Sequence, residues 1–279
     1  MPSVLVTGAG RGIGRAITEH LSARGWEVHA TARSAAALAE LATLPRVHPI
    51  DLDVTDRAAV GALAERLPER LDGVVNNAGI IVNGPLEAVA VDDLAHQLDV
   101  NVVAQVAVTQ AVLPLLRAAH GRIVFMSSTS GRYAVPGTGA YNASKFALEA
   151  VGDALRMELR PWDIRVSLVE PGPIDTGMWG DVEAAHDRMA AGFTPEHRAL
   201  YAEHLAGTRK LLSTLAKQTS DPAKVAEVVL HALTARRPRR RYLLDASSRA
   251  QVAFTSLAPA SLTDAVLSAA TTSRATRSS

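Results

Sequence analysis

Residues 7–14 read TGAGRGIG, a threonine followed by a glycine at every second position. The stretch follows a short β-branched run at residues 3–7 (SVLVT), which is typical of a buried strand. After it, apolar residues recur at helical spacing over residues 11–24, and Gly25 is placed to end that helix. A strand, a glycine-rich turn and a helix in this order predict the first unit of an alternating α/β fold.

The alternation of strands and helices continues along most of the chain. Further strands are predicted at residues 26–32, 47–50, 73–75, 122–127, 164–169 and 242–244. Helices are predicted at residues 34–44, 58–67, 91–119, 141–160 and 222–235. The longest should bend at Pro114, which lacks an amide donor. Because the strands show almost no polar alternation, we predict an α/β fold with a doubly wound parallel sheet of the Rossmann type.

Composition narrows the possible classes of protein. The 279 residues, 48% of them hydrophobic and 20% charged, fit one globular domain, because single cores extend to roughly 250–300 residues. A formal net charge of +1 provides no global field for nucleic acid or an anionic membrane. The chain has no cysteine and its nine histidines form no HExxH-like pair, so we expect no disulfide, thiolate or metal site. The first residues lack the features of a signal peptide, and no run approaches ~18 uninterrupted apolar residues. We therefore expect a cytoplasmic protein without a transmembrane segment.

The last third of the sequence has a different character. Residues 181–218 have a mostly helical pattern and are predicted to form a lid segment, after which Asp221 and Pro222 should begin a helix as N-cap and first residue. Residues 236–241 (RRPRRR) favour a solvated turn over a site for anionic lipid or nucleic acid, because no aromatic residues interleave the arginines. We predict one domain over residues 1–268 and a flexible tail over residues 269–279.

The glycine-rich turn predicts a dinucleotide site. Glycines let a pyrophosphate approach the backbone, and the N–H groups at a helix N-terminus can donate to it. A cofactor with a free 2′-hydroxyl is usually held by an acid at the end of the second strand. Here Ala32 is followed by Arg33, and Arg11 lies inside the turn. Two guanidinium groups fit a 2′-phosphate, so we expect NADP(H) rather than NAD(H); the alternative is that both are ordinary surface arginines.

Tyr141 and Lys145 lie four residues apart on a predicted helix and therefore on one face of it. A phenol with its ordinary pKa near ~10 exchanges protons poorly at neutral pH. An ammonium at ~4 Å, with an effective dielectric of ~20, attracts a phenolate by about 4 kcal/mol and could lower that pKa by up to ~3 units. The pair is therefore a candidate for proton exchange with an alcohol or ketone.

Six motifs in register resemble the short-chain dehydrogenase/reductase family of the single-domain type. They are TGAGRGIG at residues 7–14, NNAG at 76–79, DVNV at 99–102, MSSTSG at 126–131, YNASK at 141–145 and PGPIDT at 171–176. The strong resemblance covers roughly residues 3–178.

The resemblance implies four catalytic residues. Tyr141 would be the general acid in ketone reduction and the base in alcohol oxidation, and Lys145 would lower its pKa and hydrogen-bond the nicotinamide ribose. Ser128, thirteen residues before Tyr141, would orient the substrate oxygen, with Ser127 as a structural neighbour at the strand end. Asn101 would hold a water for proton relay; alternatively it is an asparagine at a helix kink.

The resemblance also implies a set of residues that shape the cofactor site. Asp53 and Val54 would meet the adenine, and Asn77, Ala78 and Gly79 would line the path from the adenosine ribose to the nicotinamide, although NNAG can also stabilise the sheet. The full set is Gly8, Gly10, Arg11, Gly12, Ile13, Gly14, Arg33, Asp53, Val54, Asn77, Ala78, Gly79, Tyr141, Lys145, Pro171, Gly172, Ile174 and Thr176.

The substrate is expected to be a small lipophilic alcohol or ketone. The late part of the chain resembles relatives that act on steroids, retinoids and similar compounds, although residues 245–248 (DASS) stand where those relatives often carry a glycine-containing turn. Residues 84–91 and 133–138 would face the lid segment across an apolar pocket. Candidate pocket residues are Met178, Trp179, Met189, Phe193, Leu200, Tyr201, Leu205, Leu211 and Leu212. Alternatively, these apolar residues pack the extra helices or a subunit interface.

Other functions remain open at this point. A redox sensor or scaffold that binds NADP(H) without turnover would have the same fold, and so would an enzyme with lyase or epimerase chemistry. The complete set of Ser128, Tyr141 and Lys145 favours an active oxidoreductase. We also expect a homodimer or homotetramer.

Overall fold

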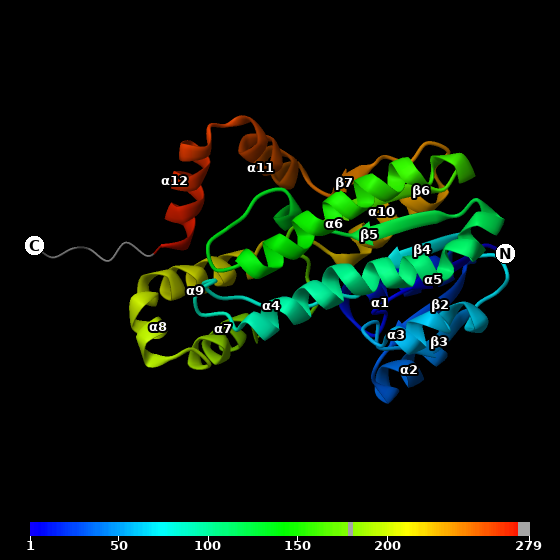
Figure 1. The fold of residues 1–279 in the computed structure, drawn as a ribbon, viewed down its shortest axis with the longest axis horizontal. Coiled ribbons are helices and arrows are strands. Elements are labelled where there is room, and N and C mark those ends of the chain that lie inside the picture. The colour runs from blue at the N-terminus through cyan, green and yellow to red at the C-terminus, as the bar shows by residue number, and fades with distance from the viewer. Residues whose placement is uncertain (178–180, 273–279) are drawn as a thin grey trace, which may run out of the picture.

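The computed structural model describes residues 1–177 and 181–272, and its centre is one parallel sheet of seven strands. Their order is β3-β2-β1-β4-β5-β6-β7, so the direction of winding reverses between β1 and β4. The sheet lies in the half of the molecule that holds the N-terminus (Figure 1). This is the predicted doubly wound Rossmann-type sheet, and ligands of such sheets bind at the carboxyl ends of the strands beside the reversal. The strands are β1 Ser3–Val6, β2 Glu27–Ala32, β3 Val47–Asp51, β4 Gly73–Asn76, β5 Arg122–Met126, β6 Arg165–Glu170 and β7 Arg241–Leu243.

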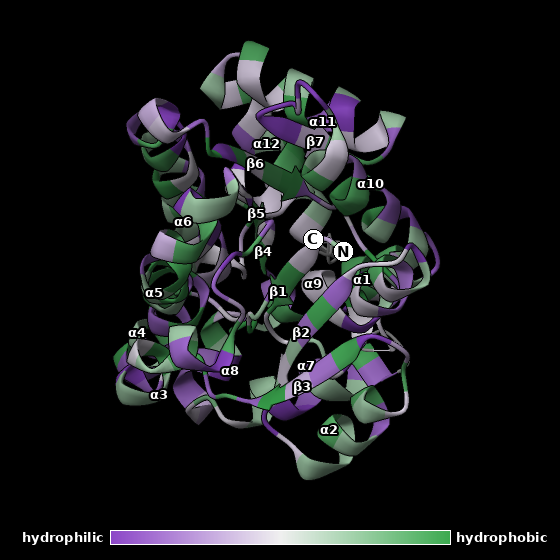
Figure 2. Cartoon of the chain, turned by 90° about the vertical axis from the view of Figure 1, so that its right-hand side faces the viewer, coloured by the Kyte–Doolittle hydropathy of each residue, from purple (hydrophilic) through white to green (hydrophobic). Residues whose placement is uncertain are grey.

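Helices cover both faces of the sheet, as Figure 2 shows with the sheet seen from the side. One face carries α1 (Gly12–Ala23), α2 (Ala35–Ala42) and α10 (Pro222–Thr234), and the other carries α3 (Arg57–Gly61), α5 (Ala104–Ala119) and α6 (Gly139–Glu158). In β1, Val4 and Val6 belong to the first core cluster and Leu5 to the second. A strand buried on both faces must be apolar at every position, which explains the continuous apolar run.

The long helix predicted over residues 91–119 is interrupted, but not at the proline. The chain forms α4 (Val91–Leu98), a π-helical turn η2 (Asp99–Val103) and then α5, which continues through Pro114. The helix continues through Pro114, and the bend expected there stays a prediction. The π turn instead carries Asn101, whose side chain bonds backbone outside the helix, and such turns are frequent at functional sites.

By length and composition, Val91–Ala119 is the helical run among the described residues that could cross a membrane. Its α5 part is a core helix, because Val108, Val112 and Leu116 are fully buried in the second core cluster. Buried core helices often have the same length and apolar composition as membrane-spanning helices, so this run is weak support for a membrane span.

The lid segment forms three helices, α7 (Val182–Ala191), α8 (Pro195–Leu200) and α9 (Ala202–Ala216), grouped at the end of the molecule away from the N-terminus (Figure 1). Asp221 caps α10 as predicted, accepting a hydrogen bond from the backbone N–H of Ala223 at 2.8 Å.

Two further helices, α11 (Ala246–Leu257) and α12 (Ala260–Thr271), follow β7. Residues 269–271 belong to α12, so the tail predicted from residue 269 is wrong for those three residues. Residues 273–279 of that tail lie outside the described part of the chain.

Candidate active site

The glycine-rich turn is fastened to the end of β4. Gly8 has a positive φ of 64°, and a Cβ there would lie 2.9 Å from the Cα of Ala78. The hydroxyl oxygen of Thr7 accepts hydrogen bonds from the backbone N–H groups of Asn77 (2.9 Å) and Ala78 (3.0 Å). Asn77 also donates through its side chain to the Thr7 carbonyl at 2.9 Å. The predicted NNAG motif thus holds the turn in place, the structural role that the sequence left open beside cofactor binding.

The same turn approaches the loop that follows β6. Gly12, with φ of 57°, lies where a Cβ would be 3.0 Å from the Cβ of Thr176. Among the described residues, the buried hydroxyl oxygen of Thr176 has no hydrogen-bond partner. A buried polar atom without a partner is costly, and here it lies beside a helix N-terminus whose free N–H groups suit phosphate. These residues fit a dinucleotide whose pyrophosphate lies over the turn.

The other predicted residues of this set take supporting positions. Gly14 lies against the Gly8 carbonyl and the Asn77 side chain, and Ile13 packs on the first core cluster. Gly79 lies close to the Asn101 side chain, and Gly172 close to the hydroxyl of Ser248. Pro171 and Ile174 are buried, and Val54 belongs to the second core cluster.

Arg33 directly follows the carboxyl end of β2, beside the glycine-rich turn. Its guanidinium is 3.4 Å from the carboxylate of Asp53, and both side chains are exposed. Hydrogen bonds from Thr55, first from its backbone N–H and then from its hydroxyl, hold the pKa of Asp53 below its usual value, with Arg33 adding to the effect. Arg11 is exposed at the N-cap of α1. The region is therefore open to a ligand, with two cations and one engaged carboxylate.

Ser128 and Tyr141 meet at the carboxyl end of β5. Ser128 caps a short 3-10 turn η3 (Thr129–Gly131), where its oxygen accepts from the Ser130 N–H at 3.1 Å and its hydroxyl donates to the Pro171 carbonyl at 3.4 Å. Tyr141 lies in the first turn of α6. Burial raises the pKa of Tyr141 to about 12, although a hydrogen bond with Ser128 acts in the opposite direction.

Lys145 is buried one helical turn after Tyr141, but its ammonium is engaged elsewhere. It donates to the Met126 carbonyl at 2.8 Å and lies 5.6 Å from the centre of the Tyr141 ring. Burial lowers the pKa of Lys145 to about 8, and the charge of Glu149 counteracts this. The predicted lowering of the Tyr141 pKa toward neutrality is therefore wrong, because desolvation outweighs the effect of an ammonium held away from the phenol.

Asn101 joins the same group of residues through α6. Its side-chain oxygen accepts from the Ile80 N–H at 2.8 Å, and its amide donates to the Ile80 carbonyl at 2.9 Å and to the Ser144 hydroxyl at 3.0 Å. Ser144 in turn donates to the Tyr141 carbonyl at 2.7 Å. The structure thus brings the four predicted residues together, while their catalytic roles stay predictions.

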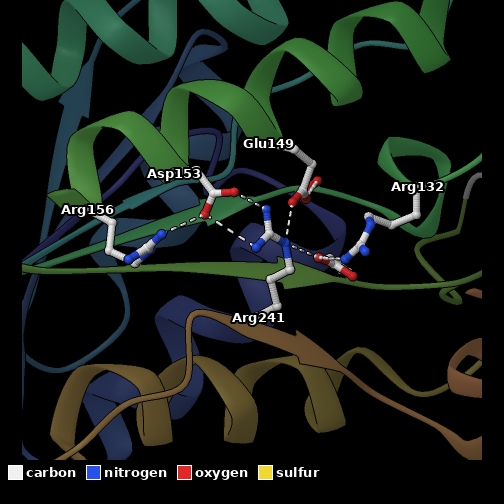
Figure 3. A network of polar contacts seen from close by, with 7 residues as sticks. Arg132, Glu149, Asp153, Arg156 and Arg241 are labelled. Atoms are coloured by element: carbon white, nitrogen blue, oxygen red, sulfur yellow. Dashed lines mark hydrogen bonds and ion pairs between the residues drawn. The ribbon is translucent and has the colours of Figure 1, made fainter. Parts of the chain in front are cut away.

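A network of charged side chains that the sequence did not reveal is centred on Arg241 (Figure 3), and its Glu149 accepts a hydrogen bond from Ser127, next to Ser128. Arg241 of β7 contacts Glu149 of α6 at 2.8 Å and Glu170 of β6 at 3.2 Å. Its terminal nitrogen reaches Asp153 at 2.7 Å. Only 17% of the Arg241 side chain is exposed, so the predicted solvated turn is wrong for this last arginine of the basic run.

Glu170 is the most deeply buried member of this network, with a side chain that is fully inaccessible to solvent. Its carboxylate is 3.3 Å from Arg132, and it shares Arg241 with Glu149. Burial, reinforced by the charge of Glu149, raises the pKa of Glu170 to about 7. Glu170 directly precedes Pro171, whose carbonyl accepts a hydrogen bond from Ser128.

A cavity of about 440 Å³ lies between the lid and two loops. It is lined by residues 83–87, by residues 134–137 with Gly139, and by six lid residues from His186 to Thr208. The predicted Met189, Tyr201 and Leu205 line it. Tyr141 and Ser128 do not, although Gly139 belongs to the same first turn of α6. Its volume is that of a typical small-molecule site, which runs from about 300 to 1,000 Å³.

Other predicted pocket residues have different places. Phe193 packs on Gly84, where a Cβ would lie 2.6 Å from the ring, and so closes the lid onto the loop after β4. Leu200 is exposed, and Leu211 and Leu212 do not line the cavity. Two of the predicted residues, Met178 and Trp179, lie outside the described residues. Within residues 1–177 and 181–272, no group of three or more potential ligands is placed to hold a metal ion.

Comparisons with known proteins agree with this architecture. Residues 2–187 match the family described as short chain dehydrogenase. Retinol dehydrogenase 5 of Mus musculus is 36% identical over 282 residues, covering 95% of this chain and 87% of that protein. The NADPH-dependent 3-dehydrocapnine reductase of Ornithobacterium rhinotracheale is 34% identical over 256 residues, covering 88% of each.

Solved structures match over nearly the full length as well. A short chain dehydrogenase from Burkholderia cenocepacia J2315 in complex with NADP is 26% identical, with a TM-score of 0.75 and coverage of 95% of this chain and 97% of that chain. A short chain dehydrogenase/reductase from Burkholderia phymatum in complex with NAD has the same TM-score and identity, covering 91% and 92%. Fold and site thus define a nicotinamide-dependent oxidoreductase scaffold for alcohols and carbonyls. The chain belongs to the short-chain dehydrogenase/reductase family.

Because Glu170 is buried, its protonation should make the free energy of unfolding depend on pH. Folded protein retains the Glu170 proton up to about pH 7, whereas the unfolded chain releases it near 4.5. The free energy of unfolding of the wild type should therefore fall relative to that of Glu170→Gln as the pH rises from about 5 to about 8, by on the order of 2 kcal/mol. Urea unfolding at several pH values measures both curves.

Glu158→Gln is the matched control, because Glu158 is exposed at the end of α6. Its unfolding free energy should stay parallel to that of the wild type across the same range. If the curve for Glu170→Gln also runs parallel to the wild type, Glu170 does not titrate near neutrality in the folded protein.

Proposed function

We propose that this protein is an NADP(H)-dependent oxidoreductase that interconverts lipophilic alcohols and ketones. The observation that carries the proposal is the convergence of Ser128, Tyr141 and Lys145 at the carboxyl end of β5. The glycine-rich turn follows β1 at the same carboxyl edge of the parallel sheet, and Thr7 ties it to the end of β4. Proton exchange and cofactor binding would therefore take place beside one another.

Residues around the glycine-rich turn would hold the cofactor. The N–H groups at the start of α1 and the unpaired hydroxyl of Thr176 would receive the pyrophosphate. Arg11 and Arg33 would bind a 2′-phosphate, with Asp53 orienting Arg33 from one side. Support for NADP(H) also comes from the NADPH-dependent relative, while the neighbour with NAD shows that the fold accepts either cofactor. When bound, NADPH supplies the hydride for the carbonyl carbon.

The chain itself would handle the proton. Ser128 would donate a hydrogen bond to the substrate carbonyl oxygen, and the Tyr141 hydroxyl would give its proton to that oxygen as it becomes a hydroxyl. Burial raises the pKa of Tyr141 to about 12, so the phenol is protonated at neutral pH and would need a nearby positive charge to give that proton up. The Lys145 ammonium, one turn away, would stabilise the phenolate that remains.

The cavity under the lid supports a lipophilic substrate. Apolar side chains form much of its lining, among them Leu86, Val135, Met189 and Leu205. The hydroxyl of Tyr201 donates to the Glu87 carboxylate at 2.6 Å, which links the lid to the loop after β4. Such a cavity beside the first turn of α6 would hold the body of a substrate whose carbonyl reaches Tyr141.

Replacing the proposed acid tests the proposed chemistry. Tyr141→Phe should lower NADPH-dependent ketone reduction at least about 1,000-fold, because the proton donor is lost, while NADPH still binds. Turnover is followed by NADPH absorbance with steroid, retinoid and aliphatic carbonyls, and binding by cofactor fluorescence. A Phe variant as active as the wild type would contradict the role of Tyr141, and a wild type that binds NADPH but reduces no carbonyl would favour a sensor or scaffold.

Cofactor choice is tested separately. The double change Arg11→Ala with Arg33→Ala should weaken NADPH binding at least about tenfold and leave NADH binding nearly unchanged, because the 2′-phosphate loses both guanidinium partners. Isothermal titration with both cofactors measures the difference. Arg24→Ala, an exposed arginine just beyond α1, is the control and should alter neither affinity. Equal losses for NADPH and NADH would remove the argument for a 2′-phosphate site.

Filling the cavity should alter substrate size preference. Met189→Trp is expected to raise KM for a bulky lipophilic ketone at least about tenfold and to leave KM for a small aliphatic ketone nearly unchanged, because the larger ring occupies the space under the lid. Leu200→Trp is the matched control, since Leu200 is a lid residue with 64% of its surface exposed. An unaltered size preference in Met189→Trp would show that substrates bind elsewhere.

A further inference from the structure

Each of the three residues from Met126 to Ser128 makes a hydrogen bond that holds it in place. The Met126 carbonyl accepts from the Lys145 ammonium at 2.8 Å, and the Ser127 hydroxyl donates to the Glu149 carboxylate at 2.5 Å. The Ser128 hydroxyl donates to the Pro171 carbonyl at 3.4 Å. Two of these three contacts come from successive turns of α6. The orientation of Ser128 therefore depends on the two residues before it.

Glu149 is fixed in turn by the last strand of the sheet. Its second oxygen accepts from the Nε of Arg241 at 2.8 Å, while Arg241 reaches Asp153 with its terminal nitrogen (Figure 3). The packing around Glu149 leaves little freedom, because a Cβ at Gly131 would lie 3.0 Å from the Glu149 Cγ and 3.1 Å from the Ser127 hydroxyl. A glycine at position 131 therefore lets η3 lie directly on this contact.

We propose that Glu149, held by Arg241, is a positioning residue of the active site: it fixes Ser128 through Ser127 and keeps a negative charge one helical turn from Lys145. This role rests on the proposed reductase activity. Glu149 touches none of the reacting atoms and acts through its neighbours. Arg241, more than ninety residues later in the sequence, thereby affects catalysis from the edge of the sheet.

Several groups surround the Lys145 ammonium. Tyr141 and Glu149 face it from its own helix, and the Met126 carbonyl faces it from β5. Behind Glu149 lie Glu170 of β6, Arg241 of β7 and Arg132 after η3. Burial lowers the pKa of Lys145 to about 8 and Glu149 raises it, so removal of the Glu149 charge should let Lys145 lose its proton at lower pH.

The test is the pH profile of carbonyl reduction at saturating NADPH. Glu149→Gln retains an oxygen for Ser127 but removes the charge. It should lower kcat about tenfold at pH 8, move the alkaline limb down by about one pH unit and leave the Kd for NADPH within about twofold. Glu149→Asp retains the charge with a shorter reach. It should keep the alkaline limb of the wild type while lowering kcat.

Asp153→Asn is the matched control, because Asp153 lies on the same helix and pairs with the same Arg241 but touches neither Ser127 nor Lys145 in the described structure. It should lower Tm about as much as Glu149→Gln and leave the alkaline limb unchanged. Since Glu170 also titrates near neutrality, the profile of Glu170→Gln is recorded as well.

Four results would overturn the proposal. Equal pH profiles for Glu149→Gln and Asp153→Asn would show that Glu149 acts on stability alone. An alkaline limb that moves in Glu170→Gln but not in Glu149→Gln would assign the effect to Glu170. A wild type with no reductase activity would overturn the proposed function together with this role, whereas an active wild type with unaffected variants would overturn this role alone.

Discussion

The hydrogen bond between the buried Lys145 ammonium and the Met126 carbonyl is the contact on which the rest of the site depends. A buried ammonium is costly unless it is bonded and faces opposite charge, and both conditions are met here by β5 and by Glu149. The bond docks the first half of α6 onto the carboxyl end of β5. Tyr141, Ser128 and the loop at Pro171 take their places around that docked helix.

Burial sets the protonation states of the two groups that would exchange the proton. Burial raises the pKa of Tyr141 to about 12 and lowers the pKa of Lys145 to about 8. The phenol is therefore a weaker acid than usual, and the ammonium is a stronger acid than usual. The charge of Glu149 limits the second effect. The proposed role of Glu149 would connect the Arg241 and Glu170 network to the chemistry of the site as well as to the packing of the sheet.

Local signals in the sequence were sufficient for much of the fold. Apolar runs predicted every strand to within one or two residues, and Asp221 with Pro222 predicted the start of α10, because strands and caps depend on neighbours in sequence. Spacing on one helix placed Tyr141 and Lys145 one turn apart on α6, but it did not predict that the ammonium bonds the Met126 carbonyl. Features that depend on contacts between distant segments were missed. Arg241 was predicted to belong to a solvated basic run, because only the pairing of β7 in the sheet places it beside Glu149 and Glu170. The direction of the Tyr141 pKa shift depends on the burial of that side chain, which the sequence does not show.

A crystal structure of the protein with bound NADPH would locate the nicotinamide relative to the proposed catalytic residues. We expect the nicotinamide ribose within hydrogen-bond reach of Lys145, about 3 Å, the ring beside the Tyr141 hydroxyl, and the 2′-phosphate between Arg11 and Arg33. A cofactor whose nicotinamide half lies away from the first turns of α6, or whose binding leaves Tyr141 and Lys145 without contact to it, would contradict the proposed site and its chemistry.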